Sequence, residues 1–228
     1  MANWSEQLAV FDLETTGVNV NVDRVVTAHI GRIDASGQPI ERADWLVNPG
    51  VIIPDGAAAV HGITTERAVA EGADAATAIV EIIDELSRLR DSGLPLVAYN
   101  AAYDLTLLAR EAQRYGVSPF EPGVVIEPLI IDKAVDRYRR GKRTLTVACE
   151  VYGVALDGAH EASADAIAAG RVAQALVRRY PDLAGLAPEE LHARQHVWQR
   201  EQAESFAEWK RKNGSPEFVA EVGWPVRG

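Results

Sequence analysis

Near the start of the chain a hydrophobic strand ends on two carboxylates, and this feature constrains the fold more than any other. Residues 8–11 are expected to form a buried strand, and Asp12 and Glu14 follow at i and i+2, on one face of a strand. Residues 15–17 then break the strand. Neighbouring carboxylates repel each other and lose hydration unless a cation lies between them, so a divalent metal is the economical explanation. The alternative is an ordinary strand end with solvated acids.

The composition is that of a globular protein with one sizeable core. The chain has 228 residues, of which 47% are hydrophobic and 25% charged. No apolar run approaches the roughly 18 residues that a membrane helix needs, and the first residues lack the pattern of a signal peptide. Cys149 is the single cysteine, which excludes an internal disulfide and a multi-cysteine zinc site. We therefore expect a reducing, cytoplasmic location and no membrane partner.

The hydrophobic pattern predicts strands first, then strands alternating with helices. Residues 23–34 and 39–47 are expected to pair with the first strand in an antiparallel meander. Residues 52–59 are expected to form a loop leading to His61, and Thr64 or Thr65 to cap a short helix. A short strand and four longer helices follow, over residues 94–99 and over 73–90, 100–115, 144–152 and 160–180.

One segment of this second half is ambiguous. Residues 124–131 are rich in β-formers but contain Pro128, which predicts an edge strand, and residues 133–138 are expected to add one or two helical turns. The order of elements indicates an α/β fold, in which a mixed β-sheet is flanked by helices.

The character of the chain changes after Pro181. We expect residues 1–181 to form one domain and residues 182–228 to form a C-terminal helical extension with a tail. Within the helix expected over residues 188–212, Trp198, Phe206 and Trp209 fall close to one face. We expect this face to pack back on the domain; the alternative is a surface for another chain, such as a second copy in a homodimer.

Further acids stand at positions where layered folds place their sites. Asp104 lies in the first turn of a helix that follows a short strand, and His160 and Asp165 lie near the start of the long helix. Taken singly, Asp104 would compensate the helix dipole and His160 would be an exposed loop histidine. Together, four carboxylates and a histidine fit a site for two divalent cations, Mg²⁺ or Mn²⁺, about 3.5–4 Å apart.

Three motifs, in this order, resemble those of the DnaQ-like 3′–5′ exonucleases. They are residues 11–17 (Phe-Asp-Leu-Glu-Thr-Thr-Gly), residues 100–104, and His160-x-Ala162-x-x-Asp165. The histidine is similar to that of the DEDDh branch, which has an RNase H-like fold, and the resemblance covers residues 7–180. Any one motif would be weak evidence, whereas all three in order are strong.

The resemblance implies a role for each site residue. Asp12, Glu14 and Asp165 would hold one cation, Asp12 would bridge to the second, and Asp104 would act mostly through water. His160 would be the general base. Leu13 and Thr15 would touch the terminal nucleotide, Asn100 would position the segment before Asp104, and His61 would lie in a loop that approaches the substrate.

The resemblance also implies a substrate class. We expect a metal-dependent exonuclease acting on single-stranded 3′ ends, with DNA favoured, and a DNA polymerase subunit as a partner. Two alternatives remain: an enzyme that trims RNA, and a non-catalytic adaptor that docks a polymerase. The four intact acids count against the adaptor.

The net charge of −10 argues against indiscriminate nucleic-acid binding, but it leaves room for a local basic rim. Residues 137–143 (Arg-Tyr-Arg-Arg-Gly-Lys-Arg) carry five basic residues in seven. A solvated basic loop and a rim that contacts phosphate are about equally supported. Tyr138, within this segment, has a side chain of the kind that can stack on a base, but nothing in the sequence shows that it does.

Overall fold

A computed structural model describes residues 3–118, 120–156 and 158–228. In chain order, the elements are η1 (Trp4–Glu6), β1 (Leu8–Thr15), β2 (Val25–Ile33), β3 (Pro39–Asn48), α1 (Asp55–His61), α2 (Thr65–Glu71), β4 (Ala73–Asp74), α3 (Ala75–Asp91), β5 (Leu96–Val97), α4 (Ala101–Tyr115), β6 (Val125–Ile126), α5 (Pro128–Val135), α6 (Leu145–Tyr152), α7 (Ala162–Arg179), η2 (Pro181–Leu183) and α8 (Pro188–Lys212). Among these helices, none is both long and apolar enough to cross a membrane.

Within the described residues the strands form one six-stranded mixed sheet, in the order β4-β3-β2-β1-β5-β6. The antiparallel meander of β1, β2 and β3 is confirmed, and β5 and β6 continue the sheet in parallel with β1. Strand β1 is therefore central, and its carboxyl end lies where the topology changes from antiparallel to parallel. Ligand sites of layered folds lie at such places.

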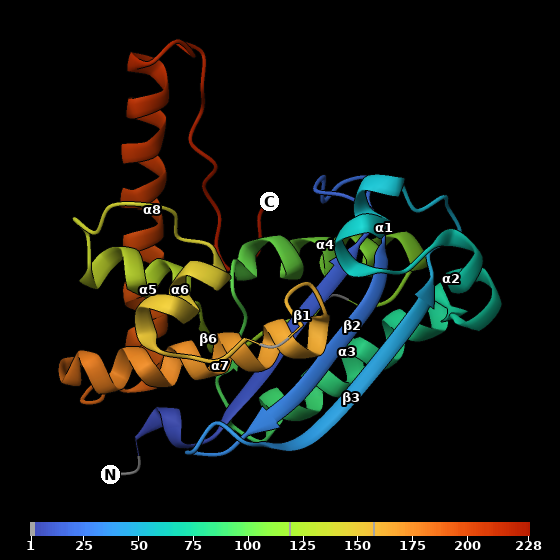
Figure 1. Ribbon diagram of the computed structural model, residues 1–228, viewed down its shortest axis with the longest axis horizontal. Helices are drawn as coiled ribbons and strands as arrows, with labels where there is room; N and C mark the ends of the chain where they lie inside the picture. The colour runs from blue at the N-terminus through green and yellow to red at the C-terminus, as the bar shows by residue number, and fades with distance from the viewer. Residues whose placement is uncertain (1–2, 119, 157) are drawn as a thin grey trace.

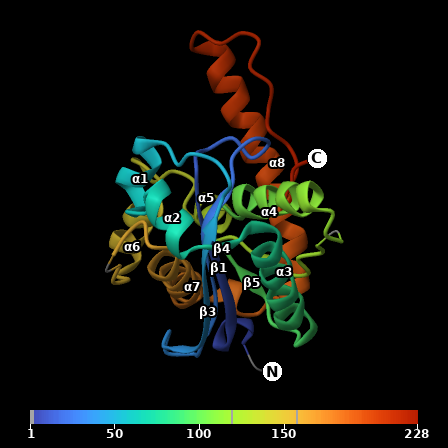
Figure 2. The ribbon, with the colours of Figure 1, turned by 90° about the vertical axis from the view of Figure 1, so that its right-hand side faces the viewer.

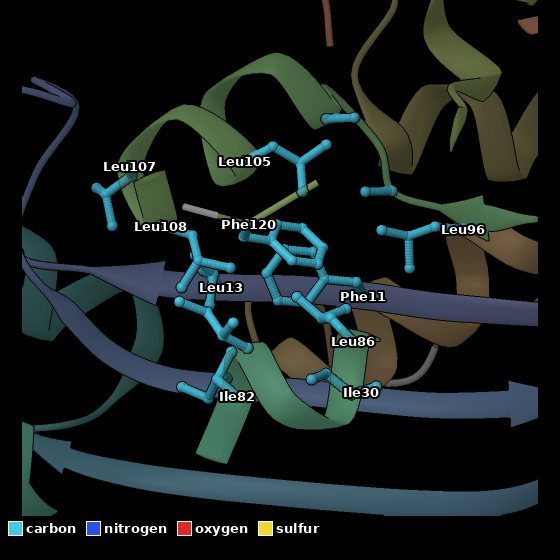
Figure 3. Close-up of a cluster of buried hydrophobic side chains, with 14 of the residues drawn as sticks. Phe11, Leu13, Ile30, Ile82, Leu86, Leu96, Leu105, Leu107, Leu108 and Phe120 are labelled. Carbon is cyan, nitrogen blue, oxygen red and sulfur yellow. The ribbon is translucent and has the colours of Figure 1, made fainter. Parts of the chain in front are cut away.

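Helices cover both faces of the sheet (Figure 2), and each face carries its own hydrophobic core. Odd-numbered residues of β1, including Phe11 and Leu13, pack against α3 and α4 (Figure 3). Even-numbered residues, including Leu8 and Val10, pack against α6 and α7. Because side chains alternate along a strand, Asp12 and Glu14 must lie on the face that α7 covers.

Helix α7 approaches this face closely because Gly170 lacks a side chain. A Cβ atom at Gly170 would lie 2.6 Å from Cδ1 of Ile33 and 2.7 Å from Cγ1 of Val10. The close approach brings the first turn of α7, which carries Asp165, beside the end of β1.

Helix α8 covers the free edge of the sheet at β6. The backbone N–H of Val125 donates to Nδ1 of His192 at 3.0 Å, and that of Glu127 donates to Oε1 of Gln195 at 2.7 Å. Nε2 of Gln195 donates in turn to the carbonyl of Val125 at 3.0 Å. These side chains take the place of a further strand, since the polar groups of an edge strand need partners when buried. The domain boundary at residue 181 stays a prediction, and these contacts cross it.

Several predicted boundaries hold and two are corrected. Thr64 caps α2, since its Oγ1 accepts from the N–H of Arg67 at 3.3 Å. The loop predicted over residues 52–59 is wrong in part, because Asp55 begins helix α1. The strand predicted over residues 124–131 is also too long. Pro128 is the first residue of α5, where its missing N–H costs nothing.

The prediction for the aromatic face of α8 is right for one residue and wrong for two. Trp198 packs against both cores. Phe206 and Trp209 are 50% and 56% exposed, because the distal half of α8 projects beyond the rest of the molecule (Figure 1). The tail after α8 returns to the domain, and its Trp224 is buried.

Candidate active site and metal centre

Three carboxylates converge at the carboxyl end of β1. Asp12 and Glu14 come from β1, and Asp165 comes from the first turn of α7. Each offers one oxygen, and these oxygens lie within 4.8 Å of one another. The structure therefore brings together acids that are 153 positions apart in sequence, as Asp12 and Asp165 are.

Asp104 approaches the same centre from the opposite face of the sheet. It is 4% exposed, and its Oδ1 accepts a hydrogen bond from the backbone N–H of Leu13 at 3.2 Å. It lies outside the group whose oxygens fall within 4.8 Å, so its part in holding a metal stays a prediction.

The carboxylates perturb one another strongly. Burial raises the pKa of Asp12 well above its usual range, and repulsion from Asp104, Glu14 and Asp165 raises it further. For Glu14, burial and then the charge of Asp165 raise the pKa to about 7. Burial also raises the pKa of Asp165, although the neighbouring His160 opposes the shift. Ionised carboxylates this close together need a compensating positive charge.

The donor set fits a divalent cation. Oδ1 of Asp165 is buried and has no hydrogen-bond partner among the described residues. Mg²⁺ and Mn²⁺ prefer such carboxylate oxygens, and a cation among Asp12, Glu14 and Asp165 would compensate the negative charges that burial there disfavours. The geometry does not select one metal over the other.

His160 stands at the rim of this centre on a left-handed backbone. Its φ is 69°, and its N–H donates to Oδ2 of Asp165 at 3.3 Å. Its side chain is exposed and lines a cavity of about 750 Å³ together with Glu14 and His61. The exposed position agrees with the reading as a loop histidine, and the shared cavity places that loop at the acidic centre.

Asn100 is the other non-glycine residue with positive φ in the described part of the chain. Its φ is 65°, and α4 begins at the next residue. Such conformations cost about 1–3 kcal/mol and collect at functional sites. Asn100 immediately precedes α4, which carries Asp104, and His160 lies two residues before α7, which carries Asp165.

The end of β1 is held by a tyrosine that sequence reasoning missed. The hydroxyl of Tyr103 donates to the carbonyl of Gly17 and lies 2.7 Å from Oγ1 of Thr15. Thr15 thus faces α4, whereas the side chain of Leu13 is buried in the core. Their contacts with a terminal nucleotide stay predictions. Tyr103 lies inside the motif of residues 100–104, and this position was the only signal of its role.

His61 ends helix α1 beside the same cavity. Its Nδ1 accepts from the N–H of Ile63 at 3.2 Å. Burial lowers its pKa, although the nearby backbone of Thr15 opposes this shift. A neutral imidazole therefore lies between the end of β1 and the cavity.

A second missed residue is Glu127, a buried acid behind α4. It is 3% exposed, and burial raises its pKa to about 7. The same carboxylate contributes to the raised pKa of Asp104. No local pattern marks it, since a glutamate before a proline is common at the start of a helix.

The basic segment divides into structural and free residues. Arg139 and Arg143 both pair with the buried carboxylate of Asp132, with Nη1 of Arg143 at 2.8 Å. Arg137, Arg140 and Lys142, by contrast, are exposed. The rim that could contact phosphate is therefore three residues, not five.

Comparison with known proteins assigns the class. Residues 9–173 match the RNase T family, which is described as an exonuclease family. The chain belongs to this exonuclease family, and it has the RNase H-like fold.

Individual relatives are longer proteins. A DNA polymerase III subunit epsilon-like protein of Rhodobacter capsulatus is 34% identical over 179 residues, which is 76% of this chain and 24% of the relative. A PolC-type DNA polymerase III of Lacticaseibacillus paracasei is 24% identical over 182 residues, covering 80% and 12%. The chain thus spans a quarter or less of these curated relatives.

Solved structures share the fold. E. coli exonuclease I in complex with a dT13 oligonucleotide has a TM-score of 0.66 at 21% identity, covering 78% of this chain and 42% of that one. Exonuclease I of Methylocaldum szegediense has a TM-score of 0.63 at 23% identity, with the same coverage of 78% and 42%. The RNase H-like sheet with flanking helices expected from the motifs is confirmed.

Proposed function

We propose that the chain is a 3′–5′ exonuclease that removes nucleotides from the 3′ end of single-stranded DNA with the help of two divalent cations, Mg²⁺ or Mn²⁺. The observation that carries this proposal is the convergence of Asp12, Glu14 and Asp165 within 4.8 Å. Acids from two elements meet at the sheet's change of topology, next to a cavity lined by two histidines.

Each residue has a distinct task in this proposal. Asp12, Glu14 and Asp165 would hold one cation, Asp12 would also be a ligand of the second, and Asp104 would act through water. When bound, the cations acidify the attacking water and stabilise charge on the leaving oxygen. An imidazole nitrogen of His160 accepts the proton of that water.

Hydrolysis then balances without further reactants. The water oxygen bonds to phosphorus, and the bond between phosphorus and the 3′ oxygen of the preceding nucleotide breaks. The leaving 3′ oxygen takes a proton from solvent, which balances the proton that His160 accepted and later returns to solvent. The shortened strand therefore keeps a 3′ hydroxyl, and the released nucleotide carries the phosphate on its 5′ oxygen. Leu13, Thr15, Asn100 and His61 would orient the terminal nucleotide.

DNA is favoured by the names of the relatives and neighbours. The structural neighbour from E. coli holds a dT13 oligonucleotide, and the curated relatives are named for DNA polymerase III. The same names support a DNA polymerase subunit as a partner of this chain.

The deciding experiment digests matched DNA and RNA oligonucleotides that carry a 5′ label. We expect stepwise shortening from the 3′ end in Mg²⁺ or Mn²⁺, faster on DNA, and no reaction in EDTA. Faster digestion of RNA would assign the chain to RNA trimming. Shortening from the 5′ end, or activity that persists in EDTA, would overturn the proposal.

A further inference from the structure

A groove between α5 and the projecting half of α8 lies outside the acidic centre. It encloses about 550 Å³. Its α8 wall carries Trp198, Phe206 and Trp209, and its α5 side carries Lys133 and Arg137. None of these residues has a part in the reaction proposed above.

The aromatic rings on the α8 wall are exposed and nearly parallel, an arrangement that suits base stacking. The rings of Phe206 and Trp209 lie nearly parallel, with an interplanar angle of 18° and centroids 6.1 Å apart. Both are half exposed. Phe218 of the tail packs edge-on against Phe206 at 5.6 Å, which holds that ring in place from behind. Exposed, ordered aromatic rings of this kind are the platforms on which bases stack.

The charge of the groove selects an anionic occupant. Lys133 and Arg137 form no ion pair with a carboxylate within the described residues, and Glu201 is the one carboxylate among the lining residues. Nζ of Lys210 lies 5.6 Å from the Phe206 ring and adds a further cation. Two copies of this chain joined through the groove would bring these cations together, whereas a phosphate backbone would neutralise them.

The groove is also close enough to receive the substrate of the acidic centre. Helix α5 begins at Pro128, directly after Glu127. The Glu127 carboxylate accepts from Trp224 of the tail, and Arg227 of the same tail donates to Thr106 of α4, the helix that carries Asp104. An eight-residue helix spans about 12 Å, so the groove at the far end of α5 lies about that distance from the start of the helix beside Glu127.

We propose that the α5–α8 groove binds the single strand upstream of its 3′ end, with bases stacked on Phe206 and Trp209 and phosphates near Lys133 and Arg137. This inference rests on the proposed function, because that function supplies a single strand whose 3′ end is at the acidic centre. The groove adds length-dependent affinity, since a strand of a few nucleotides does not reach it.

The test measures binding without cleavage. Fluorescence anisotropy with the full chain in EDTA compares labelled dT4 and dT15. The double substitution Phe206→Ala and Trp209→Ala is expected to weaken dT15 binding about 5- to 150-fold for each stacked base lost, and to leave dT4 binding unchanged. Val197→Ala, an exposed change on another face of α8, is the matched control and should have no effect.

Salt dependence tests the cations separately. Arg137→Ala should reduce the slope of log affinity against log salt for dT15 by about 0.7, the value for one phosphate contact on a single strand. Arg200→Ala, also exposed on α8 but outside the groove, should leave the slope unchanged.

Two outcomes would overturn the inference. One is equal affinity of wild type and the double variant for dT15. The other is a concentration-dependent dimer of the wild type that the double variant loses while its DNA affinity is unchanged, which would assign the groove to a second copy. A separate assay in Mn²⁺ keeps the two proposals apart, since failure of the wild type to cleave dT15 contradicts only the proposed function.

Discussion

The indole N–H of Trp224 donates a hydrogen bond to Oε2 of Glu127 at 2.7 Å, across 97 positions of sequence. Both side chains are buried, at 5% and 3% exposure. Three residues further on, the N–H of Arg227 donates to Oγ1 of Thr106 at 2.9 Å. The tail is thus tied to the back of α4, the helix that carries Asp104.

The raised pKa of Glu127 predicts how the free energy of unfolding depends on pH. Burial raises its folded-state pKa to about 7, above the value near 4.5 of an unperturbed glutamate. The folded protein therefore binds this proton more tightly than the unfolded chain does. The stabilisation is complete below about pH 4.5 and is lost as the pH rises through 7.

Glu127→Gln should remove this pH dependence. The amide oxygen can still accept from Trp224, so we expect the variant to gain roughly 2–3 kcal/mol over wild type at pH 8 and little at pH 5. Urea unfolding at pH 5, 6, 7 and 8 measures the difference. Glu189→Gln, an exposed change, is the control, and parallel curves for Glu127→Gln and wild type would contradict the assignment.

Loss of a converging carboxylate should abolish activity without unfolding the protein. We expect Asp12→Asn or Asp165→Asn to lower the cleavage rate by several orders of magnitude, because each removes a ligand of the cation. Without metal the melting temperature should stay the same or rise, since repulsion at the centre is relieved.

Metal binding at the same centre can be measured independently of catalysis, through the melting temperature. Mn²⁺ should raise the melting temperature of the wild type, because a ligand of the folded state stabilises it, and should not raise that of Asp12→Asn. The exposed Asp182→Asn should behave as wild type in both assays. An Asp12→Asn enzyme with wild-type activity would sink the metal assignment.

His160 can be tested without disturbing its backbone. Asparagine tolerates the left-handed conformation found at this position, so His160→Asn removes the imidazole and keeps φ near 69°. We expect a rate loss of roughly 10²–10⁴-fold with the metal-induced rise in melting temperature retained.

The pH–rate profile checks the role of this histidine. A general base acts in its unprotonated form, so the wild-type rate should rise with pH. The His160→Asn variant should lack this rising limb of the pH–rate profile. If the limb persists unchanged, another group is the base. His196→Asn, on α8, is the matched control.

The hydrogen bonds of Gln195 with β6 and Glu127 predict that α8 contributes to the stability of the folded domain. Gln195→Ala would leave the N–H of Glu127 without a partner and would remove one hydrogen bond to the carbonyl of Val125. We expect a loss of about 1–3 kcal/mol in the free energy of unfolding. Gln199→Ala, which removes only an exposed bond to the carbonyl of Glu221, should change it by less than about 0.5 kcal/mol.

Truncation after Tyr180 extends the same test to the whole extension. Removing α8 and the tail should greatly lower the melting temperature with the oligomeric mass unchanged. Unchanged stability with loss of a dimer would show that residues 182–228 serve a second copy instead.

The sequence by itself determined the features of the longer elements that depend on local periodicity. The i, i+2 spacing of Asp12 and Glu14 decides that they share a face, because side chains alternate along a strand. The bounds of α8 are also determined locally, because Pro188 suits a first helical turn and Asn-Gly-Ser-Pro follows the last helical residue. The order of the three motifs was enough to indicate the family.

Only the tertiary structure decided which distant groups meet. No local pattern shows that Arg139 and Arg143 are held by Asp132 while Arg137 stays free, or that Glu127 receives the indole of Trp224. Short elements such as α1 and α5 were also missed or misread, because a helix of seven or eight residues gains most of its stability from packing. Burial, which raises the pKa values of Asp12, Glu14 and Glu127, is likewise a property of the assembled layers and not of any stretch of sequence.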